Sequence, residues 1–337
     1  MSSVVELTLF VPGLLAAQPL LAEIPAGQRP DLKLLETLLS RAEVSNWGTG
    51  ERFSDLFRLF GFDAEGEVPV AAVTGVAAGF DTTQGWWLRA DPVCLAPDRD
   101  RLVLMEDEPP LRMAESEALR ATLNAHFAAD GWQIEARSPN QWFIRLDEAP
   151  RITTTPPATS IGEDIHPHLP QGEDATLWRR YLNESQMLLH DHPINQQREA
   201  EGYRPIDSLW FWGGGALPPR GAAQWDQVIS KWHLARALGR YHKVPLAGLM
   251  EDMCPPGRVL VCSEACCNAI QQGNVFDWLE SLFLIQQKWL VPIADRLRDG
   301  ARLVLLPGDE RAFSIERPRG LARLWPRRRP LMSFLAP

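Results

Sequence analysis

The chain has 337 residues, of which 45% are hydrophobic and 23% are charged, and this balance excludes disordered and fibrous proteins. Its 43 acidic and 34 basic residues give a net charge of −9, whereas proteins that bind nucleic acid or anionic membranes carry an excess of positive charge. The sequence therefore predicts a globular protein with neither nucleic acid nor a membrane as its partner.

The first part of the chain alternates between apolar runs and helical patterns. Residues 4–11 form an apolar run that predicts a buried strand, and residues 30–41 and 53–60 have the spacing of amphipathic helices. Residues from about 86 to 150 then predict two strands, a helix and two further strands, at 85–90, 101–105, 114–130, 132–136 and 141–146. This segment therefore has the pattern of an α+β subdomain.

A proline- and threonine-rich stretch separates this segment from the rest of the chain. The sequence TTTPPATS at 153–160 and the residues up to 172 predict an exposed connection, since this composition does not favour regular structure. Beyond it, helical patterns and short apolar runs alternate, at 178–189, 208–212, 258–262, 276–297 and 302–306. Continuous apolar strands between helices predict an α/β domain with a largely parallel sheet flanked by helices.

The ends of the predicted parallel strands indicate where a ligand would bind. In open α/β sheets, ligands gather at the carboxyl ends of the strands. Four chain segments follow such ends and are expected to face the ligand, namely residues 12–13, 213–215, 263–264 and 308–309.

The five cysteines are odd in number, and three of them cluster as Cys262, Cys266 and Cys267, which is not the pattern of a disulfide framework. Free thiols are typical of reducing compartments, and no apolar run reaches the ~18–20 residues that span a membrane. We therefore expect a soluble cytoplasmic protein. Buried thiols are favoured for the cluster over a zinc site, because its spacing differs from that of zinc ligands.

The most informative stretch, residues 190–219, reads HDHPINQQREAEGYRPIDSLWFWGGGALPP. It resembles the cofactor-independent phosphoglycerate mutases of the archaeal type, in the alkaline phosphatase superfamily, which share a His-Pro-Val-Asn segment, a following Arg, a Gly-x-x-Pro and an Ile-Trp-Leu-Trp-Gly strand. The matching positions are His192, Pro193, Asn195, Arg198, Gly202, Pro205, Trp210, Trp212, Gly213 and Gly215. The phrases GWWLRADPV and SLWFWGGG are closer still to a bacterial group labelled "regulatory protein, RpfE type".

The resemblance implies a fold and a division of the chain. An alkaline-phosphatase-like α/β core would consist of residues 1–85 and 165–337, and an inserted α+β subdomain would occupy residues 86–164. The core would hold the largely parallel sheet, and the insert would hold the strand–strand–helix–strand–strand segment.

The departures from the family concern its catalytic groups. The family uses two divalent metals, held by Asp and His, which clamp the attacking and leaving oxygens, and a Ser that takes the phosphoryl group. Pro12 stands where the resemblance expects the first metal-binding Asp, and the Ser nucleophile is expected near Arg52, with Ser54 two positions away. Asp309 and Glu310 stand where an Asp-His pair is expected, so one carboxylate remains and the imidazole is missing, although Glu310 could still bind a hard cation such as Mg or Mn.

Three polar residues of the matching stretch are candidate ligands for a substrate or an anion. His192 and Asn195 would line the cleft, and Arg198 would bind an anion as a bidentate donor. The alternative is structural: His192 and Asn195 would hydrogen-bond a helix end, and Arg198 would pair with a nearby carboxylate. The sequence favours the structural alternative.

Arg89 and the glycines Gly213 and Gly215 are the other candidates. Arg89 lies in a strand near the domain junction, where it would hold a phosphate or carboxylate or would form a salt bridge between the domains. The glycine-rich turn would let backbone N–H groups approach an anion. It lacks the Lys-Ser/Thr of a nucleotide-binding loop, so a tight turn that admits the neighbouring chain is favoured.

Two hypotheses about function remain. The first is a degenerate phosphoglycerate mutase-like protein, a pseudoenzyme that lacks the full two-metal site, needs no cofactor and has a binding or regulatory role. The alternative is an active metal-dependent enzyme on phosphorylated metabolites, with a rearranged site that uses Asp309, Glu310, His192 and Arg198. The partner would be a small phosphorylated ligand or a regulatory protein. No catalytic residue is assigned, and the oligomeric state is left open.

Overall fold

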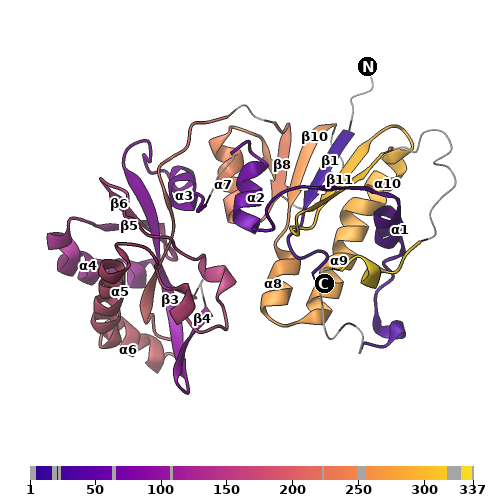
Figure 1. Ribbon diagram of the computed structural model, residues 1–337. Coiled ribbons are helices and arrows are strands. Elements are labelled where there is room, and N and C mark those ends of the chain that lie inside the picture. Colours follow the sequence, from indigo (N-terminus) through magenta and orange to yellow (C-terminus); the bar gives the residue numbers. More distant parts are fainter. Residues whose placement is uncertain are drawn as a thin grey trace. The chain divides into compact units, whose positions relative to one another are not determined.

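The computed structural model describes residues 5–16, 21, 24–62, 66–106, 109–221, 224–248, 256–316 and 328–335. The chain divides into two compact units, the first made of Met1–Ala64 and Arg220–Pro337 and the second of Glu65–Pro219. The first unit therefore holds both the indigo and the orange and yellow elements of Figure 1. No helix in the described ranges is both long enough and apolar enough to span a membrane.

The first unit is built on a mainly parallel sheet. The described residues give it seven strands, in the order β2-β12-β11-β1-β10-β8-β9. Their bounds are β1 Val5–Phe10, β2 Glu43–Asn46, β8 Gln227–Ser230, β9 Leu246–Ala247, β10 Gly257–Cys262, β11 Arg302–Leu306 and β12 Arg311–Ile315. Strands β11, β1, β10, β8 and β9 run parallel, while β12 and β2 are antiparallel at one edge.

Both faces of this sheet are covered, which explains why its central strands are apolar at successive positions. In β1, Leu7 and Leu9 share a core with Leu35 of α1 and Trp278 of α9. Phe10 points to the other face, because side chains alternate along a strand, and stacks on Trp232 at the start of α7, with ring centroids 6.0 Å apart. The helices are α1 Lys33–Arg41, α2 Arg52–Arg58, α7 His233–Tyr241, α8 Ala265–Gln271, α9 Val275–Ile285 and α10 Val291–Leu297, with a π-helical turn at Gln286–Leu290. The predicted largely parallel sheet flanked by helices is confirmed.

The second unit has an antiparallel sheet packed against helices. Within the described residues its strands follow the order β4-β3-β6-β5, and β7 also pairs with β3. The bounds are α3 Val70–Ala78, β3 Trp86–Asp98, β4 Arg101–Glu106, α4 Met113–Phe127, β5 Ile134–Ser138, β6 Gln141–Leu146, α5 Ala175–His190, α6 Pro193–Ala200 and β7 Ser208–Gly215. Strands β3 to β6 and helix α4 confirm the strand–strand–helix–strand–strand pattern. Short 3₁₀ turns across both units occupy Ala26–Gln28, Ala128–Asp130, Pro157–Thr159, His166–His168 and Leu331–Ser333.

The two units divide at 64/65 and 219/220, whereas the sequence placed the division at 85/86 and 164/165. The difference arises from β7, whose residues 208–215 pair antiparallel with residues 87–93 of β3. Helix α5 enters the same core through Trp178 and Leu189. Residues 65–85 and 165–219 therefore cluster with the second unit.

The proline- and threonine-rich stretch lies within the second unit. Ser160 is fully buried, and the backbones of Thr153 and Gln171 exchange two hydrogen bonds of 2.8 and 3.0 Å. Trp210 of β7 donates its indole N–H to the carbonyl of Thr155 at 2.7 Å. The stretch is thus held against the sheet by hydrogen bonds that its composition does not predict.

Candidate functional site

The carboxyl edge of the parallel sheet brings together three of the segments expected to face a ligand. Gly13 donates its N–H to the carbonyl of Pro307 at 3.0 Å, and Ser263 donates its N–H to the end of β1 at 3.1 Å. Gly308 has a φ of +73°, and a Cβ there would lie 2.9 Å from the Cα of Pro12. The turns after β1, β10 and β11 are therefore joined or packed at one edge.

The fourth segment, the glycine run at the end of β7, lies in the second unit. The expectation that it follows a parallel strand is wrong, because β7 pairs antiparallel with β3. A Cβ on Gly214 would lie 2.0 Å from the Trp86 ring, and a Cβ on Gly215 would lie 2.5 Å from Pro69. Gly213 has a φ of +64°, which favours glycine. Close approach of the neighbouring chain thus accounts for these glycines without a bound anion.

Asp309 and Glu310, the candidate metal ligands, lie in the turn between β11 and β12. The Asp309 carboxylate forms an ion pair with the guanidinium of Arg311 and accepts the Arg311 backbone N–H at 3.3 Å. Glu310 has a left-handed backbone, with a φ of +66°, and its carbonyl accepts the N–H of Trp47 at 2.8 Å. In the part of the chain that the structure describes, no group of three or more His, Cys, Asp or Glu side chains is arranged to hold a metal ion.

Arg52 stands at this edge too, and the sequence did not single it out as a site residue. It is the first residue of α2 and is only 6% exposed. Its Nη1 donates to the thiol of Cys267 at 2.9 Å, and its guanidinium lies 4.9 Å from the centre of the Phe53 ring. Cys267 in turn abuts the turn after β1, because its backbone nitrogen would lie 3.2 Å from a Cβ placed on Gly13.

The position that the resemblance assigns to a nucleophile is therefore occupied by a buried cation. Ser54, the serine nearest to that position, donates its backbone N–H to the carboxylate of Glu51 at 2.7 Å, which caps α2. The sequence indicates Arg52 only indirectly, because the resemblance expects the Ser nucleophile near this position. The feature that distinguishes it is a buried charge whose partner, Cys267 of α8, lies far along the chain, so it has no local signature in the sequence.

The residues that carry the family resemblance form the start of α6 and the turn after it. His192 caps α6, where its Nδ1 accepts the N–H of Ile194 at 3.2 Å. Its Nε2 lies 3.0 Å from the hydroxyl of Thr122 in α4. Because Nδ1 accepts, the neutral ring carries its proton on Nε2 and donates it to Thr122. His192 thus joins α6 to α4.

Asn195 is 2% exposed, and its side-chain amide is engaged by the backbone. Nδ2 donates to the carbonyls of Leu189 and Ile206, both at 2.8 Å, and Oδ1 accepts the N–H of Ile206 at 2.8 Å. The amide therefore ties the end of α5 to the segment that enters β7. This is the arrangement of the structural alternative.

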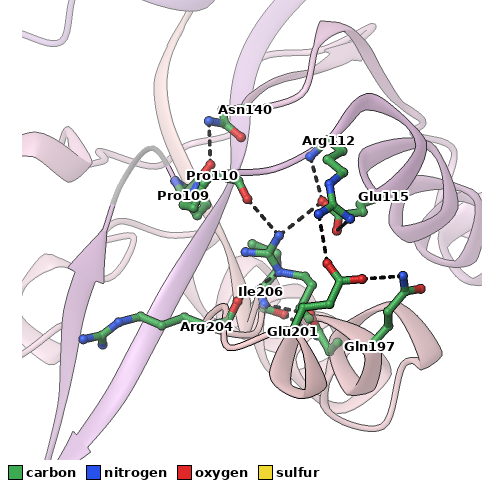
Figure 2. A network of polar contacts seen from close by, with 11 residues as sticks. Pro109, Pro110, Arg112, Glu115, Asn140, Gln197, Glu201, Arg204 and Ile206 are labelled. Atoms are coloured by element: carbon green, nitrogen blue, oxygen red, sulfur yellow. Dashed lines mark hydrogen bonds and ion pairs between the residues drawn. The ribbon is translucent and has the colours of Figure 1, made fainter.

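Arg198 is 1% exposed, and its partners Pro110, Glu115 and Arg204 are labelled in Figure 2. Nε donates to the carbonyl of Arg204 at 2.9 Å, and Nη1 donates to the carbonyl of Pro110 at 2.9 Å and to Glu115 at 3.2 Å. Glu115 also accepts the backbone N–H of Arg112 at 2.7 Å, which caps α4. Arg198 thus joins α6 to the start of α4 through a buried carboxylate.

Arg89 forms a buried ion pair with Asp91, two residues further along the same face of β3. Its Nε and Nη2 both donate to Asp91 Oδ1, at 3.0 and 2.7 Å. Asp91 also accepts the backbone N–H of Trp142 at 3.0 Å and the indole N–H of Trp212 at 2.7 Å. Arg89, Asp91, Trp142 and Trp212 all lie within the second unit, where this ion pair links β3 to β6 and β7.

The remaining cysteines of the cluster are buried. Burial raises the pKa of the thiols of Cys262 and Cys266, so both stay protonated and unreactive at neutral pH. The cysteines that the structure describes are free thiols. Cys254 lies outside the described residues.

We expect His192 to make the protein less stable as the pH falls below neutral. Burial lowers the pKa of His192 beneath its ordinary value of 6.5, so the unfolded chain binds a proton that the folded protein resists. Stability is therefore lost as the pH falls below about 6.5, by at most about 1.4 kcal/mol per pH unit for one proton. His192→Asn keeps a side chain that caps helices and should lessen that loss.

Urea unfolding at about pH 7.5 and about pH 5.5, on either side of the ordinary histidine pKa, measures this effect. His166→Asn, at an exposed position, is the control and should leave the loss unchanged. Burial also lowers the pKa of His242, so part of the loss should remain in the His192 variant. An identical pH dependence in H192N and wild type would mean that His192 does not contribute to it.

The middle of the chain is similar in sequence to a known family. Residues 55–195 match the family described as 2,3-bisphosphoglycerate-independent phosphoglycerate mutase. A probable enzyme of that name from Geobacter sulfurreducens is 29% identical over 214 residues, which cover 60% of this chain and 52% of the relative. Another from Methanothrix thermoacetophila is 28% identical over 179 residues, which cover 45% of this chain and 46% of the relative. The chain thus spans about half the length of these curated relatives.

The fold is similar to that of a solved protein, PH0037 from Pyrococcus horikoshii. The TM-score is 0.52 at 13% identity, with 94% of this chain and 88% of the other covered. At this identity the likeness concerns the fold alone. The α/β class predicted from the sequence, a largely parallel sheet flanked by helices, is confirmed, and the sequence matches support a phosphoglycerate mutase-like family for the chain.

Proposed function

We propose that this chain is a degenerate phosphoglycerate mutase-like protein that binds a small phosphorylated ligand or a regulatory partner and does not transfer phosphoryl groups. The observation that carries the proposal is the carboxyl edge of the first unit's sheet. Pro12 follows β1 where the resemblance places a metal-binding Asp, and proline has no ligand side chain. Asp309 is paired with Arg311, whose positive charge opposes a cation. The described residues at this edge therefore do not fit a two-metal centre.

Within the family we propose the bacterial branch labelled "regulatory protein, RpfE type", together with a cytoplasmic location. The phrases GWWLRADPV and SLWFWGGG support the branch. The free thiols of the described cysteines are consistent with a reducing compartment. Because the relatives are named for phosphoglycerate, the phosphoglycerates are the first ligands to test.

One observation favours the alternative, an active metal-dependent enzyme with a rearranged site. Glu310 holds a left-handed backbone, a costly conformation for a residue other than glycine that often occurs at functional sites. Its side chain is exposed and forms no ion pair with a described residue. This carboxylate is therefore available to Mn or Mg.

Metal content separates the two functions. The purified protein is incubated with Mn and with Zn, desalted and analysed for bound metal by mass spectrometry, and the phosphoglycerates are then offered as substrates. We expect no stoichiometric metal and no turnover, in the wild type and in Asp309→Ala alike. Near-stoichiometric metal that is lost in D309A, together with metal-dependent turnover, would instead establish the enzyme.

A further inference from the structure

The guanidinium of Arg52 carries two buried donors that the described part of the protein leaves unused. Its Nε and Nη2 are closed to solvent and have no hydrogen-bond partner among the described residues. In a guanidinium these two N–H groups point the same way and form an edge that binds a carboxylate or a phosphate through two parallel hydrogen bonds. Buried polar groups are normally paired, so an unpaired pair of charged donors requires an explanation.

Two other arginines show how this chain uses the same edge. Nε and Nη2 of Arg89 both donate to Asp91, and those of Arg311 both donate to Asp309. The edge of Arg52 is buried as deeply as that of Arg89, with 6% and 5% of the residues exposed. It differs from both in having no oxyanion partner among the described residues.

The acids nearest in sequence do not supply that partner. Glu51 uses its carboxylate to accept the N–H of Ser54 at 2.7 Å. Asp55 accepts two backbone N–H groups of the loop before α2, at 2.7 and 3.2 Å. Neither forms an ion pair with Arg52, and the two acids are fixed by helix and loop backbone instead.

The other end of the guanidinium is held in place. Nη1 donates to the sulfur of Cys267, which is a weak hydrogen-bond acceptor. Cys267 is half-buried, and residues 49–51, just before Arg52, are exposed. The guanidinium is therefore bound to a partly accessible cysteine at the carboxyl edge of the parallel sheet, and Arg52 directly follows an exposed loop.

We propose that Arg52 binds a small oxyanion group, a phosphate or a carboxylate, through its Nε–H and Nη2–H edge, while Cys267 orients the guanidinium. The bound group supplies the hydrogen-bond acceptors that the described residues do not offer to this edge. This inference names the chemistry of the ligand in the binding function proposed above and rests on that function. It assigns the contact to a guanidinium, with no metal between protein and anion.

The test is thermal unfolding of the full chain in EDTA, with inorganic phosphate or acetate added at constant ionic strength. We expect phosphate at about ten times its Kd to raise the wild-type Tm by roughly 2–5 °C. A larger shift with acetate would identify a carboxylate-type site, and a larger shift with phosphate a phosphate-type site. Arg52→Gln and Arg52→Lys should lose the shift, because neither has the two-pronged edge.

Arg58→Gln is the matched control, since it removes the same charge from the same helix and should retain the shift. Without added anion, R52Q should have a Tm no lower than that of the wild type, because an unpaired buried charge is unfavourable. An equal shift in wild type and R52Q would place the anion elsewhere and overturn the proposal. The absence of any wild-type shift with phosphate and with acetate would overturn it too.

A second measurement needs no variant. Iodoacetamide reacts with the thiolate, and a bound anion on Arg52 opposes a second negative charge on Cys267. Phosphate should therefore slow alkylation of Cys267 several-fold, as read from its peptide by mass spectrometry, and an unchanged rate would contradict the proposal. Both measurements are made in EDTA and therefore without metal. If phosphate and acetate have no effect, the anion contact of Arg52 is overturned, whatever the metal experiment shows. If the metal experiment shows metal-dependent turnover, the proposed function is overturned, whatever these two measurements show.

Discussion

Replacing Arg198 with alanine is expected to lower the free energy of unfolding by about 3–5 kcal/mol, because the change removes one partner of a buried ion pair. Arg198 is 1% exposed and supplies hydrogen bonds to the carbonyls of Arg204 and Pro110 and to Glu115. Without the guanidinium, the buried carboxylate of Glu115 and two partly buried carbonyls each lose a donor. Urea unfolding followed by tryptophan fluorescence measures the loss.

Arg112→Ala is the matched control, since Arg112 meets the same carboxylate from the surface. Its side chain is 58% exposed and also pairs with Glu201 (Figure 2). Exposed ion pairs contribute little to stability, so this variant should unfold at nearly the wild-type urea concentration. Equally small effects of R198A and R112A would show that the fold does not need Arg198, and would restore it as a candidate for ligand binding.

The central strands of the first unit are predictable because burial on both faces leaves a continuous apolar signal. Residues 258–262 and 302–306, which read RVLVC and RLVLL, correspond to β10 and β11. The helical spacing over 276–297 corresponds to α9, the π-helical turn and α10. Local patterns therefore indicate the elements and the class of the sheet.

The partner of β7 is not predictable in the same way. Its residues SLWFWGGG include a continuous apolar run and are buried at nearly every position, which is the pattern of a parallel strand covered on both faces. In the structure the strand is antiparallel to β3 and is covered by α3 and by the core around α5. Pairing between distant segments leaves no local pattern, so the sequence predicts a parallel strand for a run that belongs to the antiparallel sheet of the second unit.

The candidate residues illustrate a second limit of sequence reasoning. A matching motif fixes residue types and spacing, but it does not tell whether the polar atoms face a ligand or the protein's own backbone. His192, Asn195 and Arg198 all direct polar atoms to their own helices, strands and turns. Arg52 belongs to no motif, and only tertiary packing reveals that its charge is buried and unpaired.

Removing either member of the Arg89–Asp91 pair is expected to cost about 3–5 kcal/mol of unfolding free energy. Asp91 is 3% exposed and accepts N–H groups from Trp142 and Trp212 besides the two from Arg89. Asp91→Ala leaves the guanidinium buried, 5.0 Å from the Phe143 ring and 5.4 Å from the Trp212 ring. Aromatic faces attract a cation but replace a carboxylate only in part.

A double-mutant cycle with Arg89→Met and Asp91→Ala tests whether the two side chains depend on each other. The double variant leaves no unpaired charge, so urea unfolding should show a loss smaller than the sum of the single losses, by about 1–3 kcal/mol. Additive losses would mean that the two act independently, and Arg89 would again be a candidate for anion binding. Coupling of the expected size would show that Asp91 uses the Nε and Nη2 donors of Arg89, which are then not available to a ligand. The same two donors of Arg52 have no partner among the described residues, so Arg52 is the stronger candidate for binding an oxyanion.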